Sequence, residues 1–173
     1  TDEDGDGVSV ESGDCDDTDP AISPDNDEIA NNGIDDNCDG ETIELWPVEY
    51  RWAEPAPGYT FAYWPLFRAW MEMRVENRGT GDVTNVQAEV VGAPPNTTVP
   101  DPTVYLGDIS VVDGSAWSTD PDASFTTDVD MAYPDPVDPC EELTWRITYE
   151  DATGSHVIEG VPQFAPGEGP CAP

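Results

Sequence analysis

The sequence predicts a mostly β protein in which a small, irregular, Asp-rich module precedes an antiparallel β-sandwich. Two observations lead to this prediction. The first 44 residues contain 17 carboxylates, no Lys or Arg, and only six large aliphatic side chains. From residue 45 onward, short segments alternate apolar and polar residues and are separated by Pro and Gly, as half-buried strands are. We therefore place the module at 1–44 and the sandwich at 45–173.

Several segments of the second region have the period of a half-buried strand. In 69–76, Met71, Met73 and Val75 fall on one face and charged residues on the other. A turn containing Asn and Gly separates this segment from 83–91, so we expect the two to form a hairpin. Further strands are expected at 103–111, 124–133, 142–150 and 155–161. Short strands without a strong helical pattern are typical of an immunoglobulin-like antiparallel β-sandwich.

The start of the second region, residues 45–67, is rich in aromatic residues and proline. Nine of the sixteen aromatic residues lie within the 25 residues from 46 to 70, at Trp46, Tyr50, Trp52, Tyr59, Phe61, Tyr63, Trp64, Phe67 and Trp70. Four prolines interrupt strand alternation, so we expect an aromatic and Pro-rich N-terminal arm over 45–67. Two interpretations remain open. The aromatic side chains pack in the core, or they form a surface for a glycan or a neighbouring subunit.

The formal net charge of −33 limits the partners that this chain can have. All five cationic residues are arginines, and such a balance disfavours nucleic acid and anionic lipid as partners. No apolar run approaches the roughly 20 residues that span a bilayer, so membrane insertion is not expected. We expect self-association or binding to another surface protein, with a glycan as a further candidate partner.

Four cysteines lie two in each region, Cys15 and Cys38 in the first and Cys140 and Cys171 in the second. An even count without a thiol-rich metal motif favours disulfides, which form in oxidising, extracellular settings. The alternative of four free thiols fits less well, because Cys15 and Cys38 stand among polar residues and free structural thiols are mostly buried. We expect an extracellular or cell-surface location.

The first region contains two copies of a loop pattern that suits a hard cation. Residues 2–7 read Asp-x-Asp-x-Asp-Gly, and residues 35–40 read Asp-x-Asn-x-Asp-Gly. Alternate side chains of such a loop converge on one ion, and the glycine lets the backbone turn back. Oxygen donors without a nearby His favour Ca²⁺ over zinc, copper or magnesium. The candidate ligands in the two loops are Asp2, Asp4, Asp6, Asp35, Asn37 and Asp39.

Neither loop ends with the bidentate Glu of an EF-hand, because the twelfth positions are Gly13 and Trp46. The acidic cluster 14–17 is placed to supply the missing carboxylates. A count that starts at Asp17 puts Asp19 at position three and Glu28 at position twelve, which suggests a second ion held by Asp14, Asp17, Asp19 and Glu28. The remaining candidate ligands are therefore Asp14, Asp16, Asp17, Asp19 and Glu28.

A solvated, halophile-type surface is the alternative explanation for so many acidic residues. This explanation stays open for the 21 carboxylates after position 44. It does not account for ordered Asp-x-Asp-x-Asp-Gly loops beside paired cysteines. For the first region we therefore expect bound Ca²⁺, two ions or more.

The run DGDGVSVESGDCDDTDPAISPDNDEIANNGIDDNCDG resembles the MopE-type metal-binding motif family of secreted and surface bacterial and archaeal proteins. Residues 1–41 follow that pattern in order: D-x-D-x-D-G, D-C-D-D, a Pro and a Glu, then G-x-D-x-x-C-D-G. The run is also similar, more distantly, to the calcium-wrapped type 3 repeats of thrombospondin. The resemblance implies calcium-type binding and a Cys15–Cys38 bridge, and it does not imply an enzyme.

Two short strings in the second region resemble a hairpin of adhesion-type immunoglobulin-like domains from bacterial and archaeal surface proteins. They are Val-Glu-Asn-Arg-Gly at 75–79 and Thr-Asn-Val at 84–86. This resemblance implies a cell-surface protein with an immunoglobulin-like domain.

No catalytic motif accompanies these features. His156 is the single histidine, and the sequence has no G-x-S-x-G, H-E-x-x-H or glycine-rich phosphate loop. We therefore expect a non-enzymatic, extracellular, calcium-binding structural or adhesive protein, such as a self-assembling subunit of a cell-surface or extracellular filament. The alternative is a carbohydrate-binding module of a secreted protein.

Overall fold

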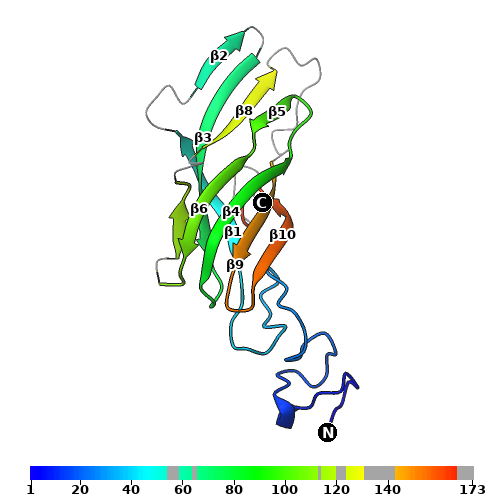
Figure 1. Ribbon diagram of the computed structural model, residues 1–173. Helices are drawn as coiled ribbons and strands as arrows, with labels where there is room; N and C mark the ends of the chain where they lie inside the picture. Colours follow the sequence, from blue (N-terminus) through cyan, green and yellow to red (C-terminus); the bar gives the residue numbers. More distant parts are fainter. Residues whose placement is uncertain (54–58, 64–65, 113, 120–123, 131–142, 167–173) are drawn as a thin grey trace.

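The computed structural model describes residues 1–53, 59–63, 66–112, 114–119, 124–130 and 143–166. Their strands form two antiparallel sheets that enclose one core (Figure 1). The prediction of a mostly β protein with a two-sheet second region is thereby confirmed. The helical element among these residues is a single 3-10 turn, η1 (Val10–Ser12). No helix in the described ranges is long and apolar enough to cross a bilayer.

Each sheet is built around one long strand. The first sheet has the order β1 (Leu45–Trp52), β3 (Leu66–Asn77), β8 (Phe125–Asp130) and β5 (Thr97–Asp101), and β2 (Tyr59–Tyr63) and β7 (Ser115–Trp117) also pair with β3. The second sheet has the order β10 (Ser155–Pro162), β9 (Thr144–Glu150), β4 (Val83–Gly92) and β6 (Thr103–Ile109).

The predicted hairpin between 69–76 and 83–91 is wrong, because β3 and β4 lie in different sheets. The link 78–82 carries the chain from one sheet to the other. Asn77 is buried at this crossing, and its Nδ2 donates to the carbonyl oxygen of Gly81 at 2.8 Å. The alternation of apolar and polar residues identifies a half-buried strand, but two strands show the same alternation whether they pair in one sheet or pack face to face from two sheets. The alternation therefore cannot identify a strand's partner.

Where the structure describes residues 45–67, they belong to the first sheet, since β1 and β2 each pair with β3. The ring of Tyr50 stacks on Trp145 with 6.3 Å between ring centroids and meets Phe125 edge-on at 6.1 Å. Tyr50 therefore packs against the core, as the first interpretation of the aromatic segment expects. The side chains of 59–67 lie outside the described part of the chain.

Apolar side chains from both sheets fill the space between them. The largest buried ones are Trp145, Phe125, Leu45, Met73, Ile109 and Ile147. The face expected from the sequence for 69–76 agrees with this core, because β3 buries Met73 and Val75. Burying one large apolar side chain contributes about 1.5–3 kcal/mol. The sandwich thus has the apolar core that residues 1–44 lack.

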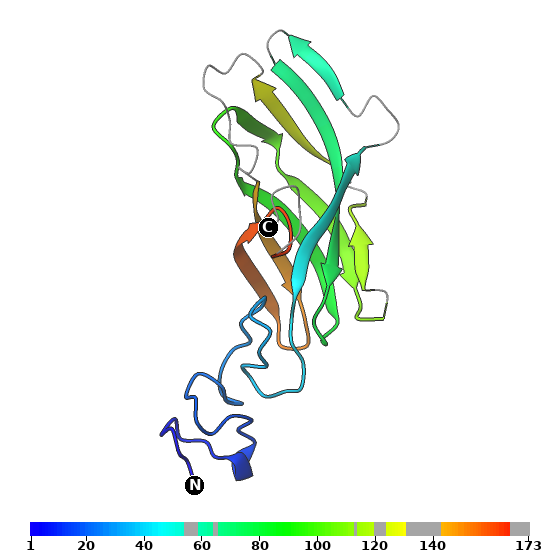
Figure 2. The ribbon, with the colours of Figure 1, turned by 180° about the vertical axis from the view of Figure 1, so that it is seen from behind.

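The acidic module extends from one end of the sandwich, next to the β9–β10 turn (Figures 1 and 2). The Asn31 side chain joins it to the first residue of β1. Its Oδ1 accepts from the Leu45 backbone N–H at 2.7 Å, and its Nδ2 donates to the Leu45 carbonyl at 3.0 Å. The Asn31 side-chain amide therefore makes the two hydrogen bonds to Leu45 that the backbone of a neighbouring strand would otherwise make.

A second set of contacts joins the module to the crossing between the sheets. The carbonyl of Thr42 accepts from the backbone N–H groups of Thr80 at 2.9 Å and Gly81 at 3.2 Å. The Thr42 N–H donates to Thr80 Oγ1 at 2.8 Å. Gly79 allows this approach, because a Cβ at that position would overlap the Thr42 carbonyl and lie 2.9 Å from the Glu44 nitrogen.

We predict that Gly79→Ala destabilises the protein by roughly 1–3 kcal/mol, because the added methyl group must push apart two backbone segments. Chemical denaturation followed by tryptophan fluorescence measures this change. Val112→Ala is the control, since Val112 is 89% exposed. Equal stability of Gly79→Ala and the wild type would show that the 42–44 segment does not pack here.

Candidate metal centre

Two loops of the module have the same hydrogen-bond pattern. In loop A (residues 2–8), Asp2 Oδ2 accepts from the N–H of Gly7 at 3.2 Å. Asp4 Oδ1 accepts from Asp6 N–H at 3.1 Å, and Asp6 Oδ1 accepts from Val8 N–H at 2.7 Å. Each short side chain thus bonds the backbone two or five residues ahead, as Asp and Asn do in turns.

Loop B (residues 35–41) repeats these bonds one for one. Asp35 Oδ2 accepts from Gly40 N–H at 2.9 Å, Asn37 Oδ1 from Asp39 N–H at 3.0 Å, and Asp39 Oδ1 from Glu41 N–H at 2.8 Å. The glycines that close the loops, Gly7 and Gly40, have φ angles of 102° and 91°, which side chains rarely allow. The spacing read from the sequence therefore forms two equivalent loops.

Loop A holds carboxylate oxygens that face one another without a partner. Ligand oxygens of Asp2, Asp4 and Asp6 lie within 4.8 Å of one another. Oδ2 of Asp4 and Oδ2 of Asp6 are both buried and accept no hydrogen bond. Buried, unpaired carboxylate oxygens are costly unless a cation compensates them. The donors present fit a hard divalent cation.

Asp14 places a further buried carboxylate near loop A. It is only 3% exposed, and its Oδ2 is buried without a hydrogen-bond partner. The N–H of Asp6 lowers the pKa of Asp4, but partial burial and the charges of Asp6, Asp14 and Asp2 outweigh this bond and raise the pKa overall. Asp14 is therefore close enough to repel Asp4. The expectation that cluster 14–17 supplies carboxylates to loop A fits this placement.

The other acidic residues of that cluster are placed differently. Asp17 lies beside loop A, where its Oδ1 accepts from the Glu3 N–H at 3.2 Å. Asp16 is exposed and bonds Thr18 at 2.7 Å, and Asp19 is exposed and accepts from Ala21 N–H at 3.1 Å. The structure does not bring Asp19 into a carboxylate cluster with Asp14 and Asp17.

Glu28 lies with loop B. Its Oε2 accepts from the Asp36 N–H at 3.1 Å, while its Oε1 is buried without a partner. Burial raises the pKa of Glu28, and the charges of Asp36 and Asp35 raise it further against the N–H bonds that it accepts. The four residues expected to hold a second ion are therefore not together in the structure. Glu28 lies beside loop B, whereas Asp14 and Asp17 lie near loop A.

Sequence reasoning missed Asp36, which organises the turn before loop B. Asp36 is 4% exposed, and its Oδ2 accepts from the Ile29 N–H at 3.1 Å and from Asn32 Nδ2 at 2.8 Å. The sequence signal that could have identified it is the pair of adjacent aspartates at 35 and 36. The loop pattern specifies only Asp35 and leaves position 36 open. A buried Asp with these donors fixes the path that brings Glu28 to loop B.

A disulfide joins Cys15 to Cys38, and this confirms the pairing that the family resemblance implied. Cys15 follows Asp14, and Cys38 stands between Asn37 and Asp39 inside loop B. The covalent bond therefore ties the segment that carries Asp14 to the ligand positions of loop B. Cys140 and Cys171 lie outside the described residues.

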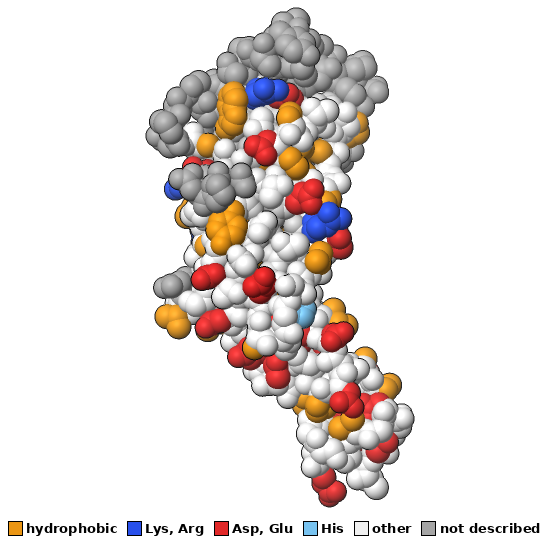
Figure 3. Space-filling model, in the orientation of Figure 1, with side chains coloured by type: hydrophobic (Ala, Val, Ile, Leu, Met, Phe, Trp, Pro, Cys, Tyr) orange, Lys and Arg blue, Asp and Glu red, His pale blue; other side chains and the backbone are white. Residues whose placement is uncertain are grey.

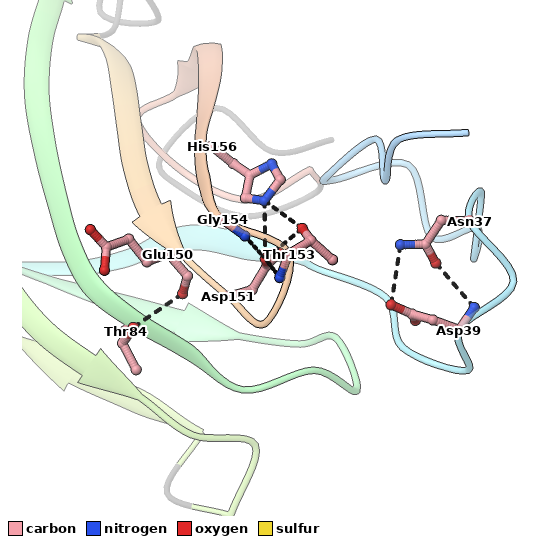
Figure 4. A network of polar contacts seen from close by, with 8 residues as sticks. All are labelled: Asn37, Asp39, Thr84, Glu150, Asp151, Thr153, Gly154 and His156. Carbon is pink, nitrogen blue, oxygen red and sulfur yellow. Dashed lines mark hydrogen bonds and ion pairs between the residues drawn. The ribbon is translucent and has the colours of Figure 1, made fainter. Parts of the chain in front are cut away.

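His156 lies on the sandwich near the joint (Figure 4). Its Nε2 is 3.0 Å from Asp151 Oδ1 and 2.9 Å from Thr153 Oγ1, and its ring stacks on Tyr149 at 5.2 Å. This histidine, on β10, thus hydrogen-bonds the side chains of the β9–β10 turn.

Acidic side chains recur over the visible face of the module and the adjacent end of the sandwich (Figure 3). The arginines visible on this face lie on the sandwich, away from the module. The module itself contains no Lys or Arg, so its carboxylates have no cationic side chain of their own.

Comparison with known proteins gives one match. A family described as "Putative metal-binding motif", of the copper-binding MopE type, matches residues 14–44. These residues include Asp14, the disulfide and loop B, while loop A precedes them. No curated protein and no solved structure shows a significant match to the chain. The match supports a metal-binding motif in the module, and the immunoglobulin-like character of the sandwich stays a prediction.

We predict that replacing both Cys15 and Cys38 by Ser destabilises the module by about 3 kcal/mol, because the bond closes a loop of moderate length. Hydrogen exchange measures the effect separately in each region. Amides of residues 1–44 should exchange faster, while amides of the sandwich core serve as the internal control. Unchanged exchange in 1–44 would mean that the loops hold their structure without the disulfide.

Proposed function

We propose that this chain is a non-enzymatic, calcium-binding structural protein that works outside the cell, with cations completing the fold of its acidic module. The observation that carries this proposal is the set of buried, unpartnered oxygens on Asp4, Asp6 and Asp14. A carboxylate without a compensating charge is destabilising in such a position, whereas a bound cation makes the same group stabilising.

The chemistry of the donors favours Ca²⁺. Loops A and B offer carboxylate, amide and backbone oxygens, which Ca²⁺ binds in flexible sets of six to eight. The copper in the name of the matching family motif suggests another ion. Copper prefers imidazole or sulfur ligands, but Cys15 and Cys38 are joined in a disulfide and His156 lies outside both loops.

The disulfide supports a location outside the reducing cytoplasm. Together with the acidic module and a sandwich built on its own core, it suits a protein of the cell surface or of an extracellular assembly. In this proposal the sandwich supplies a stable body, and the module supplies a region whose order depends on the external cation concentration.

The test is native mass spectrometry of the non-reduced protein with Ca²⁺ and with EGTA, combined with thermal melts. We expect discrete calcium increments and a rise in melting temperature of roughly 5–10 °C at a concentration about 100 times the Kd. Cu²⁺ is titrated in parallel. Binding of Cu²⁺ in preference to Ca²⁺, or of neither ion, would overturn the proposal.

The variant Asp14→Asn makes this test specific to loop A. Its amide oxygen keeps the bond from Asp16 N–H, whereas the unpartnered oxygen and its charge are lost. In EGTA the variant should be at least as stable as the wild type, because one repulsive charge is gone. In Ca²⁺ it should be less stable and hold one ion fewer. Glu11→Gln, an exposed change in η1, is the matched control.

We further propose that the protein self-associates in a calcium-dependent manner. Copies that each carry a formal charge of −33 repel one another unless bound cations reduce that charge. Sedimentation velocity should show a larger species in Ca²⁺ and its return to monomer in EGTA, with Asp14→Asn shifted less than the wild type. A monomer in both conditions at high protein concentration would contradict this expectation.

A further inference from the structure

A small pocket lies where loop B meets the β9–β10 turn. The module lines it with Glu28, Asn37, Asp39, Glu41 and Ile43, and the turn lines it with Asp151, Ala152 and Thr153. Its volume of about 10 Å³ is close to that of a single water-sized sphere. Figure 4 shows Asn37 and Asp39 on loop B beside the turn that carries Asp151 and Thr153. The pocket therefore has room for one ion between two regions far apart in the sequence.

One carboxylate oxygen on the module's side of this pocket is buried, and the Asp151 carboxylate on the turn's side is nearly so. Oε1 of Glu28 is fully buried and has no hydrogen-bond partner. The Asp151 side chain is only 9% exposed, and its hydrogen bonds to Thr153, Gly154 and His156 all use Oδ1. No hydrogen bond of normal geometry reaches Glu28 Oε1, and the nearby Ile43 N–H, which lowers the pKa of Glu28, does not outweigh the burial that raises it.

The charge around the pocket is negative on every side that the structure describes. No Lys or Arg lines it, and the chain contains no Lys. The carboxylates that line the pocket come from the module and from the β9–β10 turn, and no cationic side chain stands among them.

We infer that this pocket is a divalent-cation site shared by the two regions, in which Asp151 of the β9–β10 turn completes the ligands of Glu28 and loop B. The inference rests on the cation binding proposed above and adds a ligand from the sandwich, outside the motif. The shared site makes the ion a clamp between module and sandwich. Without it, the joint depends on neutral contacts such as those of Asn31 and Thr42.

The shared site should bind more weakly than loop A. Asp39 Oδ2 accepts from Asn37 Nδ2 at 3.1 Å, a bond that the ion must displace (Figure 4). Among the described residues, the carboxylates that already lie within 4.8 Å of one another are those of loop A. The clamp therefore closes at higher Ca²⁺ than loop A needs, so the joint stiffens after the module has folded.

The test follows hydrogen exchange of the whole chain across a Ca²⁺ titration, with bound ions counted by native mass spectrometry. Wild-type protein should gain protection in loop B and in the 151–154 turn at the same Ca²⁺ concentration. Asp151→Asn, which keeps an Oδ1 acceptor, should lose one ion, or bind it at least tenfold more weakly, and lose protection of the turn. Glu150→Gln, an exposed neighbour on β9, is the matched control and should match the wild type.

Glu28→Gln provides a second route if Asp151→Asn disturbs the turn itself. It keeps the acceptor for the Asp36 N–H and should lose the same ion. The inference is overturned if wild-type protein binds Ca²⁺ but both variants keep every ion with unchanged affinity, or if protection stays within residues 1–44. Failure of wild-type protein to bind any Ca²⁺ is a separate outcome, which overturns the proposed function as well.

Discussion

The acidic module has to place many carboxylates close together without an apolar core and without a cationic side chain. Backbone N–H groups compensate part of this charge, because Asp4, Asp6 and Asp39 each accept a hydrogen bond through Oδ1 from the N–H two residues ahead. Asn37 accepts the same kind of bond from Asp39 N–H. The second oxygen of Asp4 and of Asp6 is left buried and unpartnered. The same bonds that form the loops therefore leave the second oxygens of Asp4 and Asp6 buried, so the local fold and the proposed cation site have one cause.

The sandwich has an apolar core and arginine side chains that pair with its carboxylates, and it supplies the rigid frame to which the module is joined. Its core of Trp145, Phe125, Met73 and their neighbours is enclosed by both sheets. The contacts of Asn31 and Thr42 reach only strand ends and the crossing near Gly79. Such a joint is held by few apolar side chains, so its stiffness depends on polar groups and on any ion that they bind.

Sequence reasoning found what local patterns determine. The alternation of 69–76 correctly indicated that Met73 and Val75 are buried, and loop spacing indicated ligands that do converge, such as Asp2 and Asp4. It failed where partners are distant. β3 and β4 have the predicted periods but face each other across the core, because periodicity does not specify pairing. Asp19 was expected as a ligand from its spacing to Asp17, but its carboxylate accepts a hydrogen bond from Ala21 N–H instead. The buried Asp36 was not expected, because it stands at a position of the loop pattern that any residue can occupy.

The distribution of positive charge separates cation binding from a general halophilic surface. All five arginines lie in the sandwich, and each forms an ion pair there: Arg51 with Glu72, Arg68 with Asp128, Arg74 with Glu49, Arg78 with Glu76, and Arg146 with Glu89 and Glu159. Asp128 is buried beside Arg68, and the hydrogen bond that it accepts from the Arg68 side chain lowers its pKa. A uniform halophilic surface would have a similar ratio of acidic to basic side chains in both regions. Here the sandwich compensates part of its acidity with side chains of its own, whereas the denser carboxylates of the module have no cationic side chain among them, and this contrast supports the proposal that they bind cations from solution.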